Sequence, residues 1–366
     1  MSEWSTQPLS EVIELQRGHD LPSSERADGS VPIIGSFGVT GYHDRAMYEG
    51  PGVAIGRSGA SIGQATFVVA DYWPLNTCLF VRDFKGNNPY WIYRLLDSID
   101  FTAFNSGSAQ PSLNRNFLRS IPVALPPLPE QQAIAEVLGA LDDKIAANTR
   151  LAATADEFVR ALVALSDCTD SIPLSKLFTS PRIGVDPTQI EPTTPYVGLE
   201  HVPRRSMWLS EAGIAQDASS TKSAFEAGDL LFGKLRPYFH KVVTAPFSGI
   251  CSTDILVLRP RDADLSGFAS AAAASDAVIA SVTASSEGTR MPRASWRDLA
   301  AVDVPWPGHS AATRISEEIA SIRDTVHAGL AENRTLAATR DALLPKLMSG
   351  QLRVKNAEKI LSEVGV

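Results

Sequence analysis

The sequence predicts an α+β chain with two mixed α/β domains and two long helices, built from one unit that occurs twice. Three observations lead to this prediction: segments that recur in the same order, short β-type runs broken by turn residues, and a heptad pattern in each copy. The 366 residues leave room for two or three domains of ordinary size. The repeat therefore decides the domain organisation.

Four segments of the chain occur twice, in the same order. PLSEVIEL returns as PLSKLFTS, EGPGVAIGR aligns without gaps with EAGDLLFGK, and LAAT is repeated letter for letter. The separation of the copies drifts slowly along the chain, which indicates a duplicated unit of roughly 180 residues and excludes a short-period solenoid. The four pairs begin at Pro8 and Pro173, Glu49 and Glu226, Gly107 and Gly288, and Leu151 and Leu336.

Each copy begins with a β-rich part. Short apolar runs separated by Gly, Pro, Asn and Ser predict strands. A helix is expected over residues 89–96, because proline suits the first helical turn. The strands are expected at residues 52–55, 65–69 and 77–81 in the first copy and at 230–232, 241–243 and 254–258 in the second.

A long amphipathic helix follows each β-rich part. The first runs from Glu130 to about Val163, which corresponds to about 50 Å at 1.5 Å per residue. Its apolar residues alternate in steps of three and four, so the two helices are expected to form a two-stranded coiled coil. The seam residues are Ile134, Leu138, Leu141, Ile145 and Asn148 in the first helix and Ile315, Ile319, Ile322, Val326 and Asn333 in the second.

Asn148 and Asn333 occupy equivalent positions of that seam. A buried polar pair would fix the register of the coiled coil at some cost in stability. Partial exposure at a frayed seam explains the two residues equally well, so both interpretations stay open. The resulting domain prediction is a β-rich domain at 1–128, a helix at 129–165, a second β-rich domain at 173–309, a second helix at 310–350 and a tail at 351–366.

Composition excludes several classes of protein. A hydrophobic share of 44% with 20% charged residues describes a globular chain, and no run of about 18 apolar residues predicts a membrane span. The N-terminus lacks a secretion signal pattern, and Cys78, Cys168 and Cys251 show no metal or disulfide spacing, so we expect a cytoplasmic protein without a metal site. The net charge of −8, taken alone, argues against a nucleic-acid partner.

Motifs of common enzymes are absent from the sequence, which predicts a chain without catalytic residues. GRSGASIG at residues 56–63 lacks the lysine of a phosphate loop, and its counterpart GKLRPYFH has lost the glycines, so a turn beside a strand is expected there. NNPYW at 87–91 approaches the Asn-Pro-Pro-Tyr/Phe motif of adenine methyltransferases but lacks the second proline. A degenerate methyltransferase or nuclease centred on Asn88 and Tyr90 remains the enzymatic alternative.

Three windows of the chain contain basic residues and no acid: 101–129, 230–253 and 288–297. Two of them are equivalent in the repeat. Arg and Lys neutralise phosphates, while Asn, Gln and Arg can hydrogen-bond to base edges, so these windows are typical of a nucleic-acid surface. The candidate DNA-binding residues are Arg57, Ser108, Gln110, Asn114, Arg115, Lys234, Arg236, Tyr238, Lys241, Arg290 and Arg293.

The motifs resemble the specificity (S) subunit of type I restriction–modification systems over nearly the whole chain. SAQPSLNRNFLRSIPVALPPLPEQQAIAEVLGALDDKIAANTRL, residues 108–151, is similar to the passage from a target-recognition domain of that family into its long helix. GDLLFGKLRPYFHK, residues 228–241, is similar to a segment inside such domains. The second junction, PWPGHSAATRISEEIASI from Pro305, lacks the Pro-Leu-x-Glu-Gln core, which puts its contacts in doubt.

The resemblance implies two target-recognition domains, related by a pseudo-twofold axis and separated by two antiparallel helices, that read a split, asymmetric target in double-stranded DNA. It implies partners that catalyse: two modification (methyltransferase) subunits and restriction (motor-nuclease) subunits. S-adenosylmethionine, ATP and Mg²⁺ are then expected on those partners, with no cofactor and no membrane contact for this chain. A coiled-coil scaffold without a DNA role is the non-enzymatic alternative.

Overall fold

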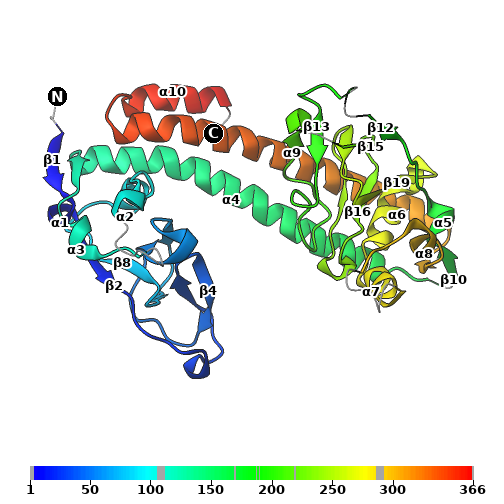
Figure 1. The fold of residues 1–366 in the computed structure, drawn as a ribbon, viewed down its shortest axis with the longest axis horizontal. Coiled ribbons are helices and arrows are strands. Elements are labelled where there is room, and N and C mark those ends of the chain that lie inside the picture. The colour runs from blue at the N-terminus through cyan, green and yellow to red at the C-terminus, as the bar shows by residue number, and fades with distance from the viewer. Residues whose placement is uncertain are drawn as a thin grey trace. The chain divides into compact units, whose positions relative to one another are not determined.

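The computed structural model describes residues 4–364, apart from 105–111, 169, 187, 189, 218–219 and 286–291. The chain forms two compact units. Unit 1 comprises Met1–Lys144 and Thr335–Val366, and unit 2 comprises Ile145–Arg334. Each unit holds one β-rich domain and a stretch of both long helices (Figure 1).

Unit 1 contains a four-stranded sheet of order β2-β8-β5-β6, a three-stranded sheet of order β4-β3-β7 and the pair β1-β9. The helix α2 (Pro89–Asp97) starts with proline in its first turn, as the sequence predicted, and packs on β5 and β6. The strands are β1 (Ser5–Pro8), β2 (Glu14–Arg17), β3 (Val31–Gly35), β4 (Gly38–His43), β5 (Gly52–Gly56), β6 (Ala65–Val68), β7 (Trp73–Pro74), β8 (Cys78–Asp83) and β9 (Pro122–Leu125), with short helices α1 (Leu9–Val12) and α3 (Arg115–Leu118).

Unit 2 repeats this plan with the sheets β11-β19-β16-β17 and β12-β15-β18-β13-β14 and the pair β10-β20. Its helices are α5 (Leu174–Leu177), α6 (Ser266–Ala273), α7 (Asp276–Ser285) and α8 (Trp296–Ala300). Its strands are β10 (Asp170–Pro173), β11 (Phe178–Thr179), β12 (Gly184–Val185), β13 (Pro195–Val197), β14 (Gly213–Ile214), β15 (Lys222–Phe225), β16 (Leu230–Gly233), β17 (Val242–Thr244), β18 (Gly249–Cys251), β19 (Ile255–Pro260) and β20 (Asp303–Trp306).

The duplication is visible in single hydrogen bonds and strand pairs. The parallel contact Ile33–Trp73 between β3 and β7 recurs as Tyr196–Ile250 between β13 and β18. The isolated bridge between Ser58 and Ser112 recurs between Leu235 and Arg293, at the separations that the sequence repeat gives. The predicted fold class, two mixed α/β domains with two long helices, is therefore confirmed.

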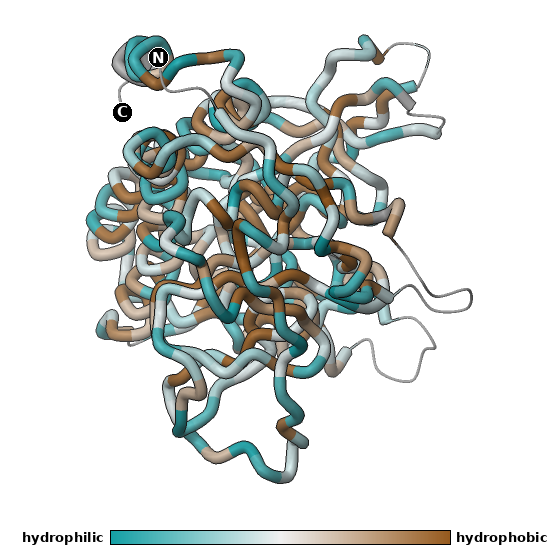
Figure 2. Tube along the Cα trace, turned by 90° about the vertical axis from the view of Figure 1, so that its left-hand side faces the viewer, coloured by the Kyte–Doolittle hydropathy of each residue, from teal (hydrophilic) through white to brown (hydrophobic). Residues whose placement is uncertain are grey.

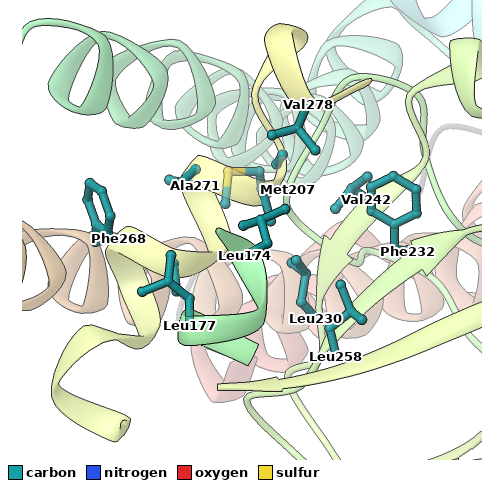
Figure 3. Close-up of a cluster of buried hydrophobic side chains, with 14 of the residues drawn as sticks. Leu174, Leu177, Met207, Leu230, Phe232, Val242, Leu258, Phe268, Ala271 and Val278 are labelled. Atoms are coloured by element: carbon teal, nitrogen blue, oxygen red, sulfur yellow. The ribbon is translucent and has the colours of Figure 1, made fainter. Parts of the chain in front are cut away.

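The main core of unit 2 lies between its β-rich domain and the long helices. Leu174, Leu230, Phe232 and Phe268 are fully buried there beside apolar residues of both helices (Figure 3). Hydrophobic and hydrophilic residues alternate along the elements (Figure 2), as one-sided burial requires. In the described part of the chain no single helix is long and apolar enough to span a membrane, although the bent pair Ala263–Ala273 and Asp276–Ser285 meets that test jointly.

The two long helices are α4 (Leu128–Ala164) and α9 (His309–Met348), followed by α10 (Val354–Val364). The helix α4 begins two residues before the expected Glu130, because Pro129 fits within its first turn. Among the predicted seam residues, Ile145 and Ile322 are only half-buried. Ile134, Leu138, Leu141, Ile315, Ile319 and Val326 are buried.

Asn148 and Asn333 are paired across the two helices. The Asn148 amide donates to Asn333 Oδ1 at 2.9 Å and to the Gly329 carbonyl at 3.2 Å. In return, the Asn333 amide donates to the Ile145 carbonyl at 3.3 Å. Both side chains are only half-buried, so the structure combines the two interpretations that the sequence left open: the residues are paired and partly exposed, and the helices run antiparallel at this contact. The pair connects amides to a carbonyl on each helix, so it fixes the axial register there.

Candidate nucleic-acid interface

The loops that follow β5 and β16 have left-handed residues at the same two positions although the residues differ. Gly59 and Gly63 have φ of +74° and +79°, and their counterparts Arg236 and His240 have φ of +50° and +52°. The left-handed region costs a residue with a side chain about 1–2 kcal/mol. The second copy therefore keeps the conformation after losing both glycines. A turn beside a strand, as the sequence suggested, describes both loops.

Contacts from neighbouring segments hold the loop of unit 2 in this conformation. The Arg236 N–H donates to the Pro292 carbonyl at 2.9 Å, and the buried His240 ring places Nε2 2.8 Å from the Ala274 carbonyl. Burial lowers the pKa of His240, so the ring is neutral and its Nε2 carries the hydrogen that this carbonyl accepts. These two contacts tie both ends of the loop to neighbouring segments.

In unit 1 the corresponding loop borders a basic cleft of about 720 Å³. Arg57 extends from the end of β5, Arg17 and Arg82 come from β2 and β8, and Asn114 and Arg115 begin α3. Two acids offset part of this charge, because Asp20 lies 3.4 Å from Arg17 and Glu14 lies 3.6 Å from Arg82. Arg115 is exposed and makes no ion pair with a residue that the structure describes.

Arg57 is half-buried and belongs to the wall of this cleft. Its Nη1 donates to the Asn76 carbonyl at 3.4 Å, and its buried Nε finds no partner in the described residues. In unit 2 the equivalent residue is Lys234, whose amine donates to the carbonyl of Thr253, the counterpart of Asn76. A basic side chain at the same repeat position therefore hydrogen-bonds the same turn in both copies. This contact gives both residues a structural role beside the predicted one.

The remaining candidates of unit 2 separate into two groups. The Lys241 amine donates to the Leu199 carbonyl, and burial and the nearby Arg204 lower its pKa. Arg236, Tyr238 and Arg293 are exposed, and Arg293 approaches Asp254 at 3.6 Å. The exposed group presents two guanidinium groups and one phenol, while the lysines are held by the backbone. Ser108, Gln110 and Arg290 lie outside the described residues. DNA contact by each of these candidates stays a prediction.

Arg204 belongs to the same surface, although the sequence did not single it out. Its guanidinium carbon lies 3.9 Å from the centre of the Phe239 ring, and that of Arg236 lies 5.8 Å from it. Tyr238 meets the same ring edge-on at 4.9 Å. A guanidinium stacked on an aromatic ring has fewer orientations, which prepares it for a bidentate contact. Arg204 lies outside the acid-free windows, with Glu200 four residues before it, so the sequence offered no local signal.

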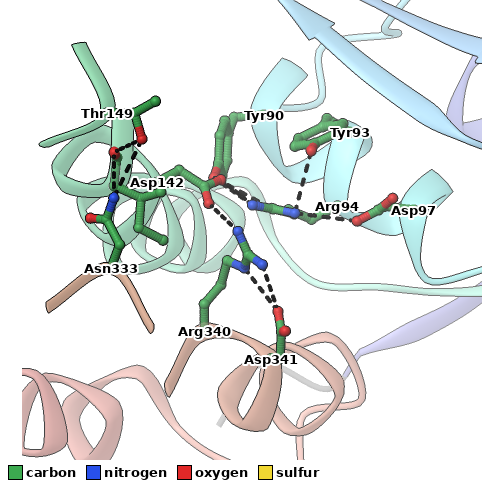
Figure 4. Close-up of polar contacts among 10 residues, drawn as sticks. Tyr90, Tyr93, Arg94, Asp97, Asp142, Thr149, Asn333, Arg340 and Asp341 are labelled. Atoms are coloured by element: carbon green, nitrogen blue, oxygen red, sulfur yellow. Dashed lines mark hydrogen bonds and ion pairs between the residues drawn. The ribbon is translucent and has the colours of Figure 1, made fainter. Parts of the chain in front are cut away.

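The residues of the methyltransferase-like NNPYW segment make structural contacts. Asn88 is the N-cap of α2, where its side chain accepts from the Trp91 N–H at 3.0 Å. The Tyr90 hydroxyl donates to Asp142 of α4 (Figure 4). The Asn88 side chain and the Tyr90 hydroxyl therefore both make hydrogen bonds within unit 1.

Known proteins resemble this chain in sequence. Residues 1–155 match the family described as type I restriction modification DNA specificity domain. A putative type I restriction enzyme specificity subunit of Haemophilus influenzae is 30% identical over 145 residues, which cover 38% of each chain. The EcoprrI specificity subunit of Escherichia coli is 26% identical over 145 residues, covering 38% of this chain and 36% of the relative. The matched region is thus little more than a third of either relative.

A solved structure extends the likeness of fold to most of the chain. The S subunit of a type I restriction–modification system from M. genitalium covers 94% of this chain with a TM-score of 0.65 at 15% identity. The structural likeness concerns the fold, and the family match concerns residues 1–155. The resemblance to type I specificity subunits that the motifs indicated is therefore confirmed.

Proposed function

We propose that this chain is the DNA-reading subunit of a type I restriction–modification complex. Its two β-rich domains each read one half of a split, asymmetric DNA sequence. Adenine methylation and restriction belong to modification and motor-nuclease subunits, which hold S-adenosylmethionine, ATP and Mg²⁺. The chain itself recognises the target and catalyses no step.

One observation carries this proposal: the same loop and bridge occur in both units, with different side chains on them. Ser112 and Arg293 occupy one equivalent position, and Gly59 and Arg236 another. A common scaffold gives both units the same way of approaching a duplex, whereas side chains decide which bases are read. Two different sets of side chains support two different half-sites, and hence an asymmetric target.

Charge explains how an acidic chain can fulfil this role. The net charge is −8, yet the cleft of unit 1 is lined by Arg17, Arg57, Arg82 and Arg115. Such local basic surfaces neutralise phosphates, while the acidic remainder repels DNA beyond them. We therefore expect weak binding by the chain alone and tight binding once basic partner surfaces complete the complex.

The test compares DNA binding by the assembled complex with and without the exposed cations of the cleft. Arg115→Ala together with Arg82→Ala should weaken binding and lower the slope of log K against log salt by about 0.9 for each lost phosphate contact. Arg314→Ala, an exposed arginine on α9, is the matched control. Equal affinity and equal salt slope for all three proteins would favour a scaffold without a DNA role. Loss of methylation with unchanged binding in Asn88→Ala would favour the degenerate methyltransferase.

A further inference from the structure

In unit 1 the helix α2 is attached to α4 by two polar side chains on one helix face. Gln131 and Asp142 are eleven residues apart, which corresponds to three helical turns. The buried Gln131 side chain donates to Asn87 Oδ1 at 2.8 Å and accepts from the Asn88 N–H at 3.0 Å. It therefore ties the start of α2 to α4, and Asp142 contacts the residues that follow.

Asp142 connects three elements through one carboxylate (Figure 4). Its Oδ2 accepts from the Tyr90 hydroxyl and from Arg94, both on α2. Its Oδ1 accepts from Arg340 of α9 at 2.9 Å. The Arg94 side chain is only 5% exposed, so its buried charge needs acidic partners to be stable. Among the described residues it is paired with Asp142 and, at 3.2 Å, with Asp97.

Two aromatic rings flank the Arg94 guanidinium group and limit its orientation. The Arg94 guanidinium carbon lies 4.6 Å from the centre of the Tyr93 ring and 5.5 Å from that of Tyr90. Burial and the Asp142 carboxylate raise the pKa of Tyr90, so its hydroxyl keeps the proton that it donates. One carboxylate held by a phenol and two guanidinium groups thus ties α2 and α9 to the same point of α4.

Unit 2 docks its equivalent helix by a different kind of contact. The repeat places Gly267 and Ala271 of α6 where α2 has Tyr90 and Arg94, and Arg323 where α4 has Asp142. A Cβ on Gly267 would lie 2.8 Å from the Ser316 carbonyl oxygen and 3.0 Å from the Ile319 Cβ, so α6 lies close against the backbone of α9. Ser316 adds one hydrogen bond, accepting from the Phe268 N–H at 2.9 Å. At the atypical second junction, this close packing stands where unit 1 has the Gln131 and Asp142 contacts.

We propose that Asp142 is a positioning residue, which fixes the orientation of the first β-rich domain on its helices and thereby the half-site spacing that the complex accepts. This inference rests on the proposed function. The buried apolar residues of α2 hold it by shape, whereas its polar attachment to α4 is weakened when the central charge is removed. One base pair shifts a half-site by about 3.4 Å along the duplex and rotates it by about 35° around the axis, so the domain must both shift and turn on its helices to admit a neighbouring spacing.

The experiment uses the complete complex with its methyltransferase partners and a DNA library in which the spacer length varies. The wild type should methylate one spacing. Asp142→Asn keeps the shape and removes the charge, and should reduce the preference for that spacing over its neighbours by about tenfold or more. The exposed neighbour Asp143→Asn is the matched control and should keep the wild-type preference. Half-site sequences should be the same for all three proteins.

Tyr90→Phe provides a second variant that removes one hydroxyl and keeps the ring packing. If Asp142→Asn does not fold, as judged by circular dichroism, this variant decides: relaxed spacing supports the inference and wild-type spacing overturns it. Folded variants that both keep the wild-type preference also overturn it. A wild-type complex that methylates no split sequence would refute the proposed function instead, which separates the two failures.

Discussion

Replacing Arg236 by glycine separates the folding role of this residue from its DNA role, because unit 1 carries Gly59 at the same place. Arg236 has φ +50° and ψ +66°, and relief of the left-handed strain should stabilise the fold by about 1–2 kcal/mol. The greater freedom of glycine in the unfolded chain removes about 0.4–1 kcal/mol. Loss of the exposed contact with Phe239 removes about 0.5–1 kcal/mol more. These effects nearly cancel, so the free energy of unfolding should change by about 1 kcal/mol or less.

Binding should respond differently from stability. If Arg236 contacts a phosphate, Arg236→Gly lowers the salt slope of binding by about 0.9. If it contacts a base edge, affinity falls by about 1–3 kcal/mol and one position of the target is read less strictly. The assay combines thermal unfolding with fluorescence anisotropy of the assembled complex on labelled DNA at several salt concentrations.

Arg236→Lys is the control, because it keeps both the left-handed strain and the positive charge. Two outcomes would refute this reasoning. Unchanged affinity and salt slope in Arg236→Gly would place the residue outside the interface. A loss of more than about 3 kcal/mol in stability would show that the side chain holds the loop together, contrary to the strain argument.

Three further predictions concern other parts of the chain. Asn333→Ala removes one of the acceptors of the Asn148 amide and the hydrogen bond from Asn333 to the Ile145 carbonyl, and should cost about 0.5–1.5 kcal/mol in urea unfolding, whereas an unchanged midpoint would mean that the pair contributes nothing. Burial lowers the pKa of His327 to about 4, so the unfolded chain binds the proton first and the free energy of unfolding falls as the pH drops from about 6.5 towards 4. His327→Gln should flatten that dependence, and parallel curves of stability against pH for the two proteins would contradict the assignment. Arg204→Lys should keep the salt slope and relax one base position, and unchanged specificity would exclude a base contact.

The features that the sequence predicted well depend on residues close together in the chain. Turn residues mark the strands, and steps of three and four mark the seam from Ile134 to Asn148, because neighbouring side chains decide both patterns. The features it missed depend on residues far apart. The stacking of Arg204 on Phe239 joins separate loops, and the contacts of Asp142 join three helices. The left-handed loop of unit 2 was hidden because Arg236 adopts a conformation that sequence patterns assign to glycine.

The central claim is that this chain decides which DNA sequence its partners methylate. Mapping methylated adenines across the host genome, with the gene intact and with the gene deleted, tests it most directly. The account predicts one split, asymmetric motif that is methylated in the intact strain and unmethylated in the deletion. An identical methylation map in both strains would contradict it.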